Sequence, residues 1–255
     1  MDQFMSSSSL KSAAKGQLLG KYSVTTAITL LMGVCLLPIS MIISLIIGTS
    51  SVASVLLYSA AQFLLQILTG FFLAGEAYAY LTIASGAVPS VKDLFRCFGE
   101  DASKVTYVQA VAGGISVLCS LPAMILGIFT LNSLPQLTEE ALASNEISGD
   151  AILFLVYAIV YLAGTILSLF VELMLSQRFY LMMDFPDYSA SQLLKMSISL
   201  MKENKGRLFY IMISFLPLLF LCFLSCGISL IWIRPYMQAV YANFYLDLVR
   251  KRKNG

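Results

Sequence analysis

Long uncharged stretches, separated by short charged segments, make up most of this chain. Residues 22–75 carry no charged side chain over 54 positions. One membrane-crossing helix needs about 20 apolar residues, so this stretch is long enough for two helices joined by a turn at residues 48–51. Two further apolar stretches follow at residues 105–131 and 151–177. The pattern predicts a set of helices that cross a membrane.

The stretch from residue 208 to residue 249 decides the topology, because it crosses the membrane either once or twice. One span would place the basic residues 250–253 on the opposite side from Lys202, Lys205 and Arg207. Two spans, with a turn at residues 225–227, place both basic clusters on the same side. Lys and Arg near span ends favour the cytoplasm, so two spans are the better interpretation. Arg234 and Pro235 then fall inside the last helix.

The predicted fold class is all-α: a polytopic membrane helix bundle with six transmembrane helices arranged as three hairpins. Of the 16 Lys and Arg residues, 15 lie in the predicted cytoplasmic segments and Arg234 is the exception. This bias predicts a multi-pass protein of the plasma membrane with both termini cytoplasmic. The expected parts are a cytoplasmic amphipathic segment (1–21), a single membrane domain (22–249) and a basic cytoplasmic tail (250–255). The expected spans are about 22–48, 52–79, 105–131, 151–177, 208–226 and 228–249.

Short amphipathic helices are expected at the cytoplasmic surface of the membrane. The segment 6–21 begins with serines that can cap a helix, and it carries Leu10 and Leu18 on one side. Two later segments begin with capping-box patterns, Ser90 with Asp93 and Ser189 with Gln192. These patterns predict interfacial helices before the third span and before the fifth.

The composition excludes several classes of function. Apolar residues make up 58% of the chain and charged residues only 12%, about half the share that soluble domains carry. The chain has no histidine, and its five cysteines show no metal-ligand spacing, so we expect neither a metal nor another cofactor. The basic residues stand in short blocks between apolar stretches, which indicates topology signals and no nucleic-acid partner. No motif of a catalytic site is present, so we do not expect an enzyme.

Three of the predicted helices carry polar side chains on one face, at intervals of three, four or seven residues. Lipid offers such groups no hydrogen bonds, so these faces should point into the bundle. Two interpretations are open: hydrogen bonds that hold the helices together, or a polar cavity lined by the three helices. The candidate cavity residues are Gln62, Gln66, Glu76, Tyr161, Thr165, Glu172, Arg234, Gln238 and Tyr241.

The charged members of this set are expected at different depths. Glu76 and Glu172 lie about 21–24 residues from the outer ends of their spans, which places both near the cytoplasmic boundary. Arg234 lies about six or seven residues below the outer turn, a depth of roughly 9–10 Å that no acidic residue of the other spans should share. We therefore expect Arg234 to extend outward or to pair with Asp150, with an anionic ligand as the alternative.

The chain resembles a bacterial integral-membrane family known as domain of unknown function 975. The resemblance is carried by Leu10 and Lys11 with Lys15, by the segment from Ser197 to Lys202, and by Gly227, Pro235-Tyr236 and Ala242-Asn243-Phe244-Tyr245 near the end. It extends over nearly the whole chain and implies no activity or site residues. The chain is also distantly similar to the membrane domains of some glycerophosphodiester phosphodiesterases, although it carries no hydrolase domain.

Two functions follow as hypotheses. In the first, the polar face of the bundle binds or passes a small solute, an ion or a lipid headgroup. In the second, the protein is a membrane scaffold or accessory subunit whose amphipathic cytoplasmic segments dock a cytoplasmic partner or anionic lipid. Anionic lipid and a membrane-protein partner are the further partners considered. In both, the lipid bilayer is the principal partner.

The predicted topology can be tested with reporters that are active only in the cytoplasm. A reporter fused after Gly255 should be active, and the same reporter inserted at Ser144 should be inactive, because the two sites lie on opposite sides of the membrane. Activity at Ser144 would reject the layout. An inactive fusion after Gly255 alone would favour five spans.

Overall fold

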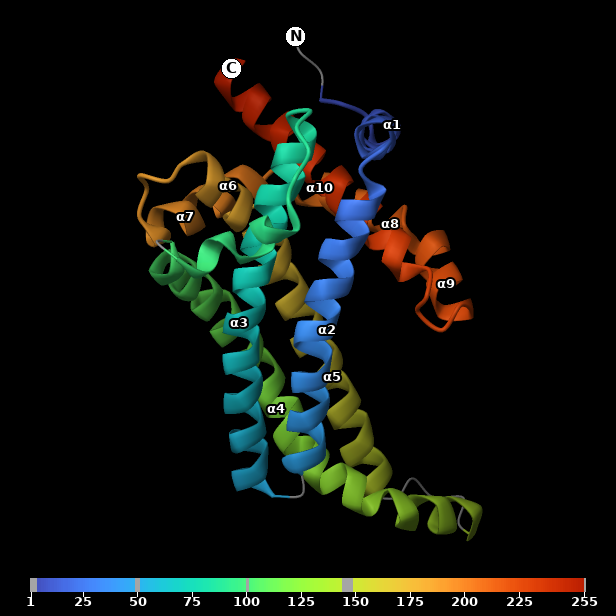
Figure 1. Ribbon diagram of the computed structural model, residues 1–255. Coiled ribbons are helices and arrows are strands. Elements are labelled where there is room, and N and C mark those ends of the chain that lie inside the picture. The colour runs from blue at the N-terminus through green and yellow to red at the C-terminus, as the bar shows by residue number, and fades with distance from the viewer. Residues whose placement is uncertain (1–3, 49–50, 100, 144–148, 255) are drawn as a thin grey trace. The chain divides into compact units, whose positions relative to one another are not determined.

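The computed structural model describes residues 4–48, 51–99, 101–143 and 149–254, and in these residues the fold is entirely helical (Figure 1). Asp150, expected as a partner of Arg234, and Ser144 lie among residues whose side chains are not described. The long helices are α2 (Tyr22–Ile46), α3 (Val52–Ala84), α4 (Ala102–Ala143), α5 (Gly149–Leu175) and α10 (Leu230–Asn254). The shorter ones are α1 (Ser7–Leu18), η1 (Val91–Phe98), α6 (Arg178–Asp184), α7 (Ala190–Met201), α8 (Lys205–Ile213) and α9 (Leu216–Leu224).

Five helical stretches among the described residues are long and apolar enough to cross a membrane. Four of them correspond to the first four predicted spans, and the fifth combines α8 and α9. The sixth predicted span corresponds to α10, which does not meet this criterion because charged and amide side chains recur along it. The six-span layout therefore stays a prediction. The five stretches are Tyr22–Ile46, Val52–Ala84, Ala102–Thr130, Ile152–Asp184 and Lys205–Leu224.

The local signals for helix starts are confirmed. Ser6 caps α1, and its hydroxyl accepts a hydrogen bond from the backbone N–H of Ser9 at 3.1 Å. Ser90 and Asp93 form the predicted capping box at the start of η1, and Ser189 and Gln192 form another at the start of α7. Each box satisfies backbone N–H groups that the first turn of a helix leaves without a partner.

The predicted turn at residues 225–227 is also confirmed. α9 ends at Leu224, and the backbone N–H of Gly227 donates to the carbonyl of Cys222 at 2.8 Å. Gly227 has a φ of 88° and Cys226 a φ of 50°, so the chain leaves the helix through the left-handed region. Glycine adopts this region without strain, which explains its position at this turn.

The chain forms two compact units. Unit 1 comprises Met1–Leu37, Leu68–Gln109 and Leu173–Gly255, and unit 2 comprises Pro38–Ile67 and Ala110–Glu172. Unit 1 therefore contains both terminal helices, together with α6 to α9. Unit 2 contains only segments of α2 to α5 and the connections between them.

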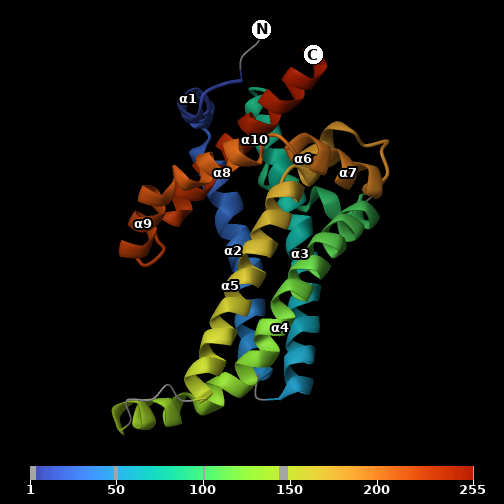
Figure 2. The ribbon, with the colours of Figure 1, turned by 180° about the vertical axis from the view of Figure 1, so that it is seen from behind.

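In unit 1, α1 packs against α10, and Figure 2 shows both helices near the two ends of the chain. Leu10, Ala14 and Leu18 of α1 are fully buried. Gln17 and Asn243 exchange two side-chain hydrogen bonds, of 3.1 and 2.7 Å. The apolar side of α1, which we expected to face the membrane interface, is thus covered by protein.

In unit 2, α3, α4 and α5 approach closely at small residues. A Cβ atom on Gly113 would lie 2.7 Å from the Gln66 side chain, and one on Gly164 would overlap the carbonyl oxygen of Cys119. The Ser59 hydroxyl lies 3.8 Å from the sulfur of Met124. The close approach at Gly113 shows why helices in lipid favour small residues where they meet.

Two glycines of unit 1, one tightly packed and one in open space, allow a matched test of close packing at glycine. A Cβ on Gly75 would overlap the backbone of η1, at 2.8 Å from the carbonyl oxygen of Asp93 and nearer still to that of Leu94. Gly75→Ala should therefore destabilise the protein by about 1–3 kcal/mol.

Gly16 of α1 is the control, because a Cβ there meets no atom within 4 Å. Gly16→Ala should be neutral or stabilise by up to about 1 kcal/mol through its higher helix propensity. Unfolding titrations with SDS measure both changes. Equal stabilities for the two variants would contradict the close approach of α3 to η1.

Candidate functional site

Three of the residues proposed from the sequence meet in unit 1: Glu76, Arg234 and Gln238. The Glu76 side chain, on α3, is 2% exposed. Nη2 of Arg234, on α10, donates to Oε2 of Glu76 at 2.9 Å, and Nε donates to Oε1 at 3.3 Å. Both carboxylate oxygens are therefore bound by one guanidinium, the geometry that gives the strongest pairing between these groups.

Helices α2 and α10 complete the surroundings of the pair. Gln238 follows Arg234 by one helical turn, and its Nε2 donates to Oε2 of Glu76 at 3.4 Å. On α2, the sulfur of Met32 lies 3.3 Å from Nη2 of Arg234. Met32 belongs to an apolar core with Ile28, Phe72, Ala79 and Leu94. The ion pair thus lies against the apolar core of unit 1.

Two polar groups at the pair have hydrogen-bonding capacity to spare. Tyr80 lies one turn after Glu76 on α3 and is 1% exposed. Its hydroxyl forms no hydrogen bond of ordinary geometry with a described residue, although Thr29 is close. Nη1 of Arg234 donates to no described residue, and this side chain is 30% exposed. An acceptor arriving from outside would find a donor here.

The contact between Arg234 and Glu76 corrects the expectation drawn from the sequence. We expected no acidic residue at the depth of Arg234, and Glu76 lies in direct contact with it. The depth was counted from the turn at residues 225–227 along a straight hairpin. The count also assumed that α10 crosses the membrane, and α10 is not among the described helices that are apolar enough to do so, so residue counting gives no depth for Arg234.

The remaining candidate residues are not brought into this cluster. Gln62 and Gln66 lie in unit 2, where Nε2 of Gln62 donates to the Tyr58 hydroxyl at 3.0 Å and Gln66 packs on Gly113. Tyr161 is 57% exposed. Thr165 is exposed, and its hydroxyl donates to the backbone carbonyl of Tyr161. Glu172 is exposed. Tyr241 is half-buried, and its ring centre lies 6.3 Å from that of Phe215.

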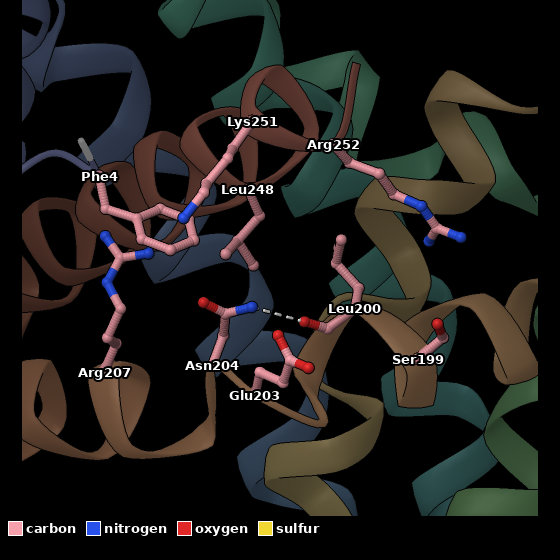
Figure 3. A pocket seen from close by; sticks show the side chains of 9 residues that line it. All are labelled: Phe4, Ser199, Leu200, Glu203, Asn204, Arg207, Leu248, Lys251 and Arg252. Carbon is pink, nitrogen blue, oxygen red and sulfur yellow. Dashed lines mark hydrogen bonds between the residues drawn. The ribbon is translucent and has the colours of Figure 1, made fainter. Parts of the chain in front are cut away.

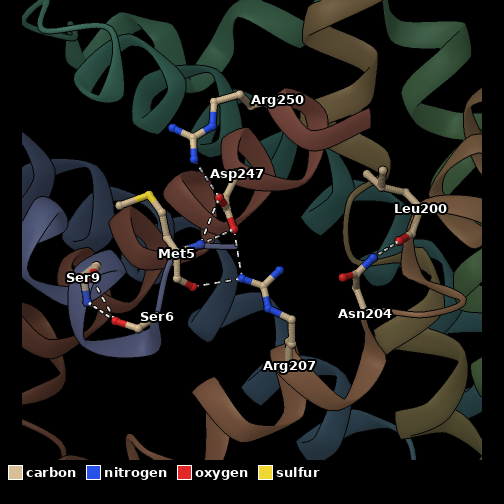
Figure 4. A network of polar contacts seen from close by, with 8 residues as sticks. All are labelled: Met5, Ser6, Ser9, Leu200, Asn204, Arg207, Asp247 and Arg250. Carbon is tan, nitrogen blue, oxygen red and sulfur yellow. Dashed lines mark hydrogen bonds and ion pairs between the residues drawn. The ribbon is translucent and has the colours of Figure 1, made fainter. Parts of the chain in front are cut away.

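A second polar network joins the two ends of the chain (Figure 4). Asp247 of α10 has a side chain only 1% exposed. It accepts a hydrogen bond from Arg207 Nη2 at 2.9 Å, one from the backbone N–H of Met5 at 3.2 Å, and one from Arg250 at 3.5 Å. Sequence reasoning missed this network, since Arg207 and Asp247 stand 40 positions apart.

The final turns of α10 also hold α6. The Tyr245 hydroxyl donates to Asp184 at 2.6 Å, and its ring stacks on that of Tyr180 with centroids 5.2 Å apart. Asn243, Phe244 and Tyr245, which carried part of the family resemblance, are all buried. These residues therefore have a packing role in unit 1.

The cysteine of η1 has the properties of a packing residue. Cys97 of η1 is fully buried, and this burial raises the pKa of its thiol to about 11. A thiol with so high a pKa stays protonated and unreactive near neutral pH. Among the described residues no group of three or more His, Cys, Asp or Glu side chains is placed to hold a metal ion.

The helices and their apolar surfaces define an all-helical, multi-pass membrane protein. The family described as "Protein of unknown function (DUF975)" matches residues 1–253, and the chain belongs to this family. Searches of curated proteins and of solved structures return no match. The comparisons do not support the more distant resemblance to glycerophosphodiester phosphodiesterases, which stays a prediction.

The Glu76–Arg234 pair can be tested with a double-mutant cycle. Glu76→Gln and Arg234→Gln should each destabilise the protein by about 2–4 kcal/mol, because each leaves a charge without its partner in a mostly buried place. The double variant should lose less than the sum of the two. Asp187→Asn, the same chemical change at an exposed carboxylate, is the control. Strictly additive losses in SDS titrations would show that the two side chains do not interact.

Proposed function

We propose that this protein is a non-enzymatic plasma-membrane protein, with both termini cytoplasmic, that binds a small solute, an ion or a lipid headgroup at the cluster of Glu76, Arg234 and Gln238. The observation that carries this proposal is the buried carboxylate and its guanidinium partner, set against an apolar core. Charged side chains are rare in membrane helices and generally serve a function there.

Stability alone is a weak explanation for such a pair. Removing two charges from water costs several kcal/mol per ion, and apolar residues of similar size often replace a buried pair without loss. The hydroxyl of Tyr80, buried without a hydrogen bond of ordinary geometry, adds a cost of about 1–3 kcal/mol. A bound molecule that accepts or donates a hydrogen bond at Tyr80 would remove this cost.

The exposure of the two partners indicates which ligand chemistry fits. The carboxylate of Glu76 is enclosed, whereas the Arg234 side chain is 30% exposed and its Nη1 has no described partner. A ligand therefore reaches the guanidinium first. An oxygen acceptor, such as a carboxylate, a phosphoryl group or a carbonyl, suits this donor.

The second hypothesis, a scaffold or accessory subunit, concerns other residues. It draws on the basic cytoplasmic segments at residues 92–104 and 195–207. The second of these ends at Arg207, whose guanidinium pairs with Asp247. The two functions therefore involve separate places in unit 1 and can be tested separately.

Tyr80→Phe is the most informative variant for the binding proposal, because it removes only the hydroxyl. Without ligand the variant should be as stable as the parent or more stable, since an unpartnered polar group is lost. The assay measures the thermal unfolding of the purified protein with chloride, sulfate, phosphate, acetate, glutamate, Na⁺ and K⁺. At ten times its Kd, a bound ligand stabilises the parent by about 1.4 kcal/mol. Tyr80→Phe should lose most of that shift.

Tyr78→Phe is the matched control on the same helix, because Tyr78 contacts the guanidinium of Arg96 through its ring at 4.3 Å. It should respond to ligands as the parent does. A parent that none of these solutes stabilises, or a Tyr80→Phe variant that responds fully, would refute binding at this cluster.

A further inference from the structure

A basic pocket lies where the end of α10 meets the loop between α7 and α8 (Figure 3). Its volume is about 490 Å³. This is within the range of about 300–1,000 Å³ typical of small-molecule sites. The lining residues that bear on its chemistry are Phe4, Glu203, Asn204, Arg207, Lys251 and Arg252.

The charge of the pocket is positive. Arg207, Lys251 and Arg252 face one acidic residue, Glu203. Nζ of Lys251 lies 3.6 Å from the centre of the Phe4 ring, and neither Lys251 nor Arg252 forms an ion pair with a described carboxylate. The positive charges at this end of α10 are therefore available to an anion.

Arg207 is fixed in the wall of the pocket and adds to its positive charge. Its Nη2 is bound by Asp247 and by the backbone carbonyl of Met5, at 2.9 and 3.1 Å. Its Nη1 is buried and has no hydrogen-bond partner among the described residues. Because Nη1 has almost no accessible surface, Arg207 attracts an anion in the pocket through its charge and not through a hydrogen bond from this atom.

An adjoining cavity of about 460 Å³ shares Phe4 and Arg207 with the basic pocket. Leu10, Tyr210 and Ile211 also line it, so it is the more apolar of the two. Arg207 itself lies near the start of the apolar stretch Lys205–Leu224, which is long enough to span a membrane. A charged pocket beside an apolar one, at the end of a span, matches the two parts of a lipid molecule.

From these contacts we infer that the basic pocket binds the phosphoryl headgroup of an anionic phospholipid, with the adjoining cavity receiving the apolar part. Lys251 and Arg252 hold the phosphoryl oxygens, and the charge of Arg207 adds to the attraction. Phe4 is fixed between Arg207, 3.9 Å from its ring centre, and Lys251. The site is separate from the Glu76 cluster and does not depend on the function proposed there.

The test uses the purified full-length protein in a neutral detergent, with short-chain phosphatidylglycerol, phosphatidylcholine and inorganic phosphate as probes. Phosphatidylglycerol should raise the thermal midpoint in a saturable manner, with an affinity at least fivefold higher than that of phosphatidylcholine. The affinity should fall as salt rises, because screening weakens exposed charges. Equal binding of the two lipids would overturn the inference. Binding of inorganic phosphate as tight as that of phosphatidylglycerol would show a phosphate site and no lipid site.

The site variant is Lys251→Gln with Arg252→Gln, which spares the Arg207–Asp247 pair. Both residues are exposed, so the variant should fold like the parent. It should bind phosphatidylglycerol at least tenfold more weakly. Lys92→Gln with Lys195→Gln is the control, because it removes the same charge from exposed positions outside the pocket and should change the affinity less than twofold. Parent-like binding by the site variant, or equal weakening in the control, would refute the pocket as the site.

Discussion

The carboxylate of Glu76 needs a cation, and much of unit 1 depends on how that need is met. A carboxylate 2% exposed among apolar helices is stable as an ion only with a close positive partner. Arg234 supplies that partner and thereby fixes α10 against α3 and α2. α10 in turn binds α1 through Asn243 and carries Asp247, which holds Arg207 and the N-terminal segment. One ion pair thus positions the helix to which both ends of the chain are attached.

The parts of the fold that the sequence predicted are those with local signals. The caps at Ser90 and Ser189 and the turn at Gly227 each depend on residues within a few positions of one another, and all three are confirmed. The first four spans are likewise found as long apolar helices, because about 20 apolar residues in succession are a strong signal. Glu76 and Arg234 are 158 positions apart, and no local pattern relates them.

The polar residues chosen from the sequence show the same contrast between local signals and contacts between distant positions. Helical spacing correctly placed Arg234 and Gln238 on one face of α10, since both reach Glu76. Helical spacing could not show which helix faces the polar side of α10. The polar stripes that contain Gln62 and Tyr161 lie in unit 2, where these two residues contact side chains of their own helices. Tyr80 continues the stripe of α3 one turn beyond Glu76, so the spacing that found Glu76 also leads to this buried hydroxyl, which has Thr29 nearby but no hydrogen bond of ordinary geometry among the described residues. Arg207 and Asp247 had no such signal.

The basic residues at the end of the chain are predicted to act as a topology signal, and two of them also line a pocket. Their charge favours the cytoplasmic side during insertion, a role that needs no defined structure. In the structure α10 continues to Asn254, so Lys251 and Arg252 are held on a helix and are not part of a loose tail. A helix fixes the direction of each side chain, and this places Lys251 over Phe4 and both residues at one pocket. The positive charges predicted to orient the last span therefore lie, after folding, at the pocket in which we propose that an anionic headgroup binds.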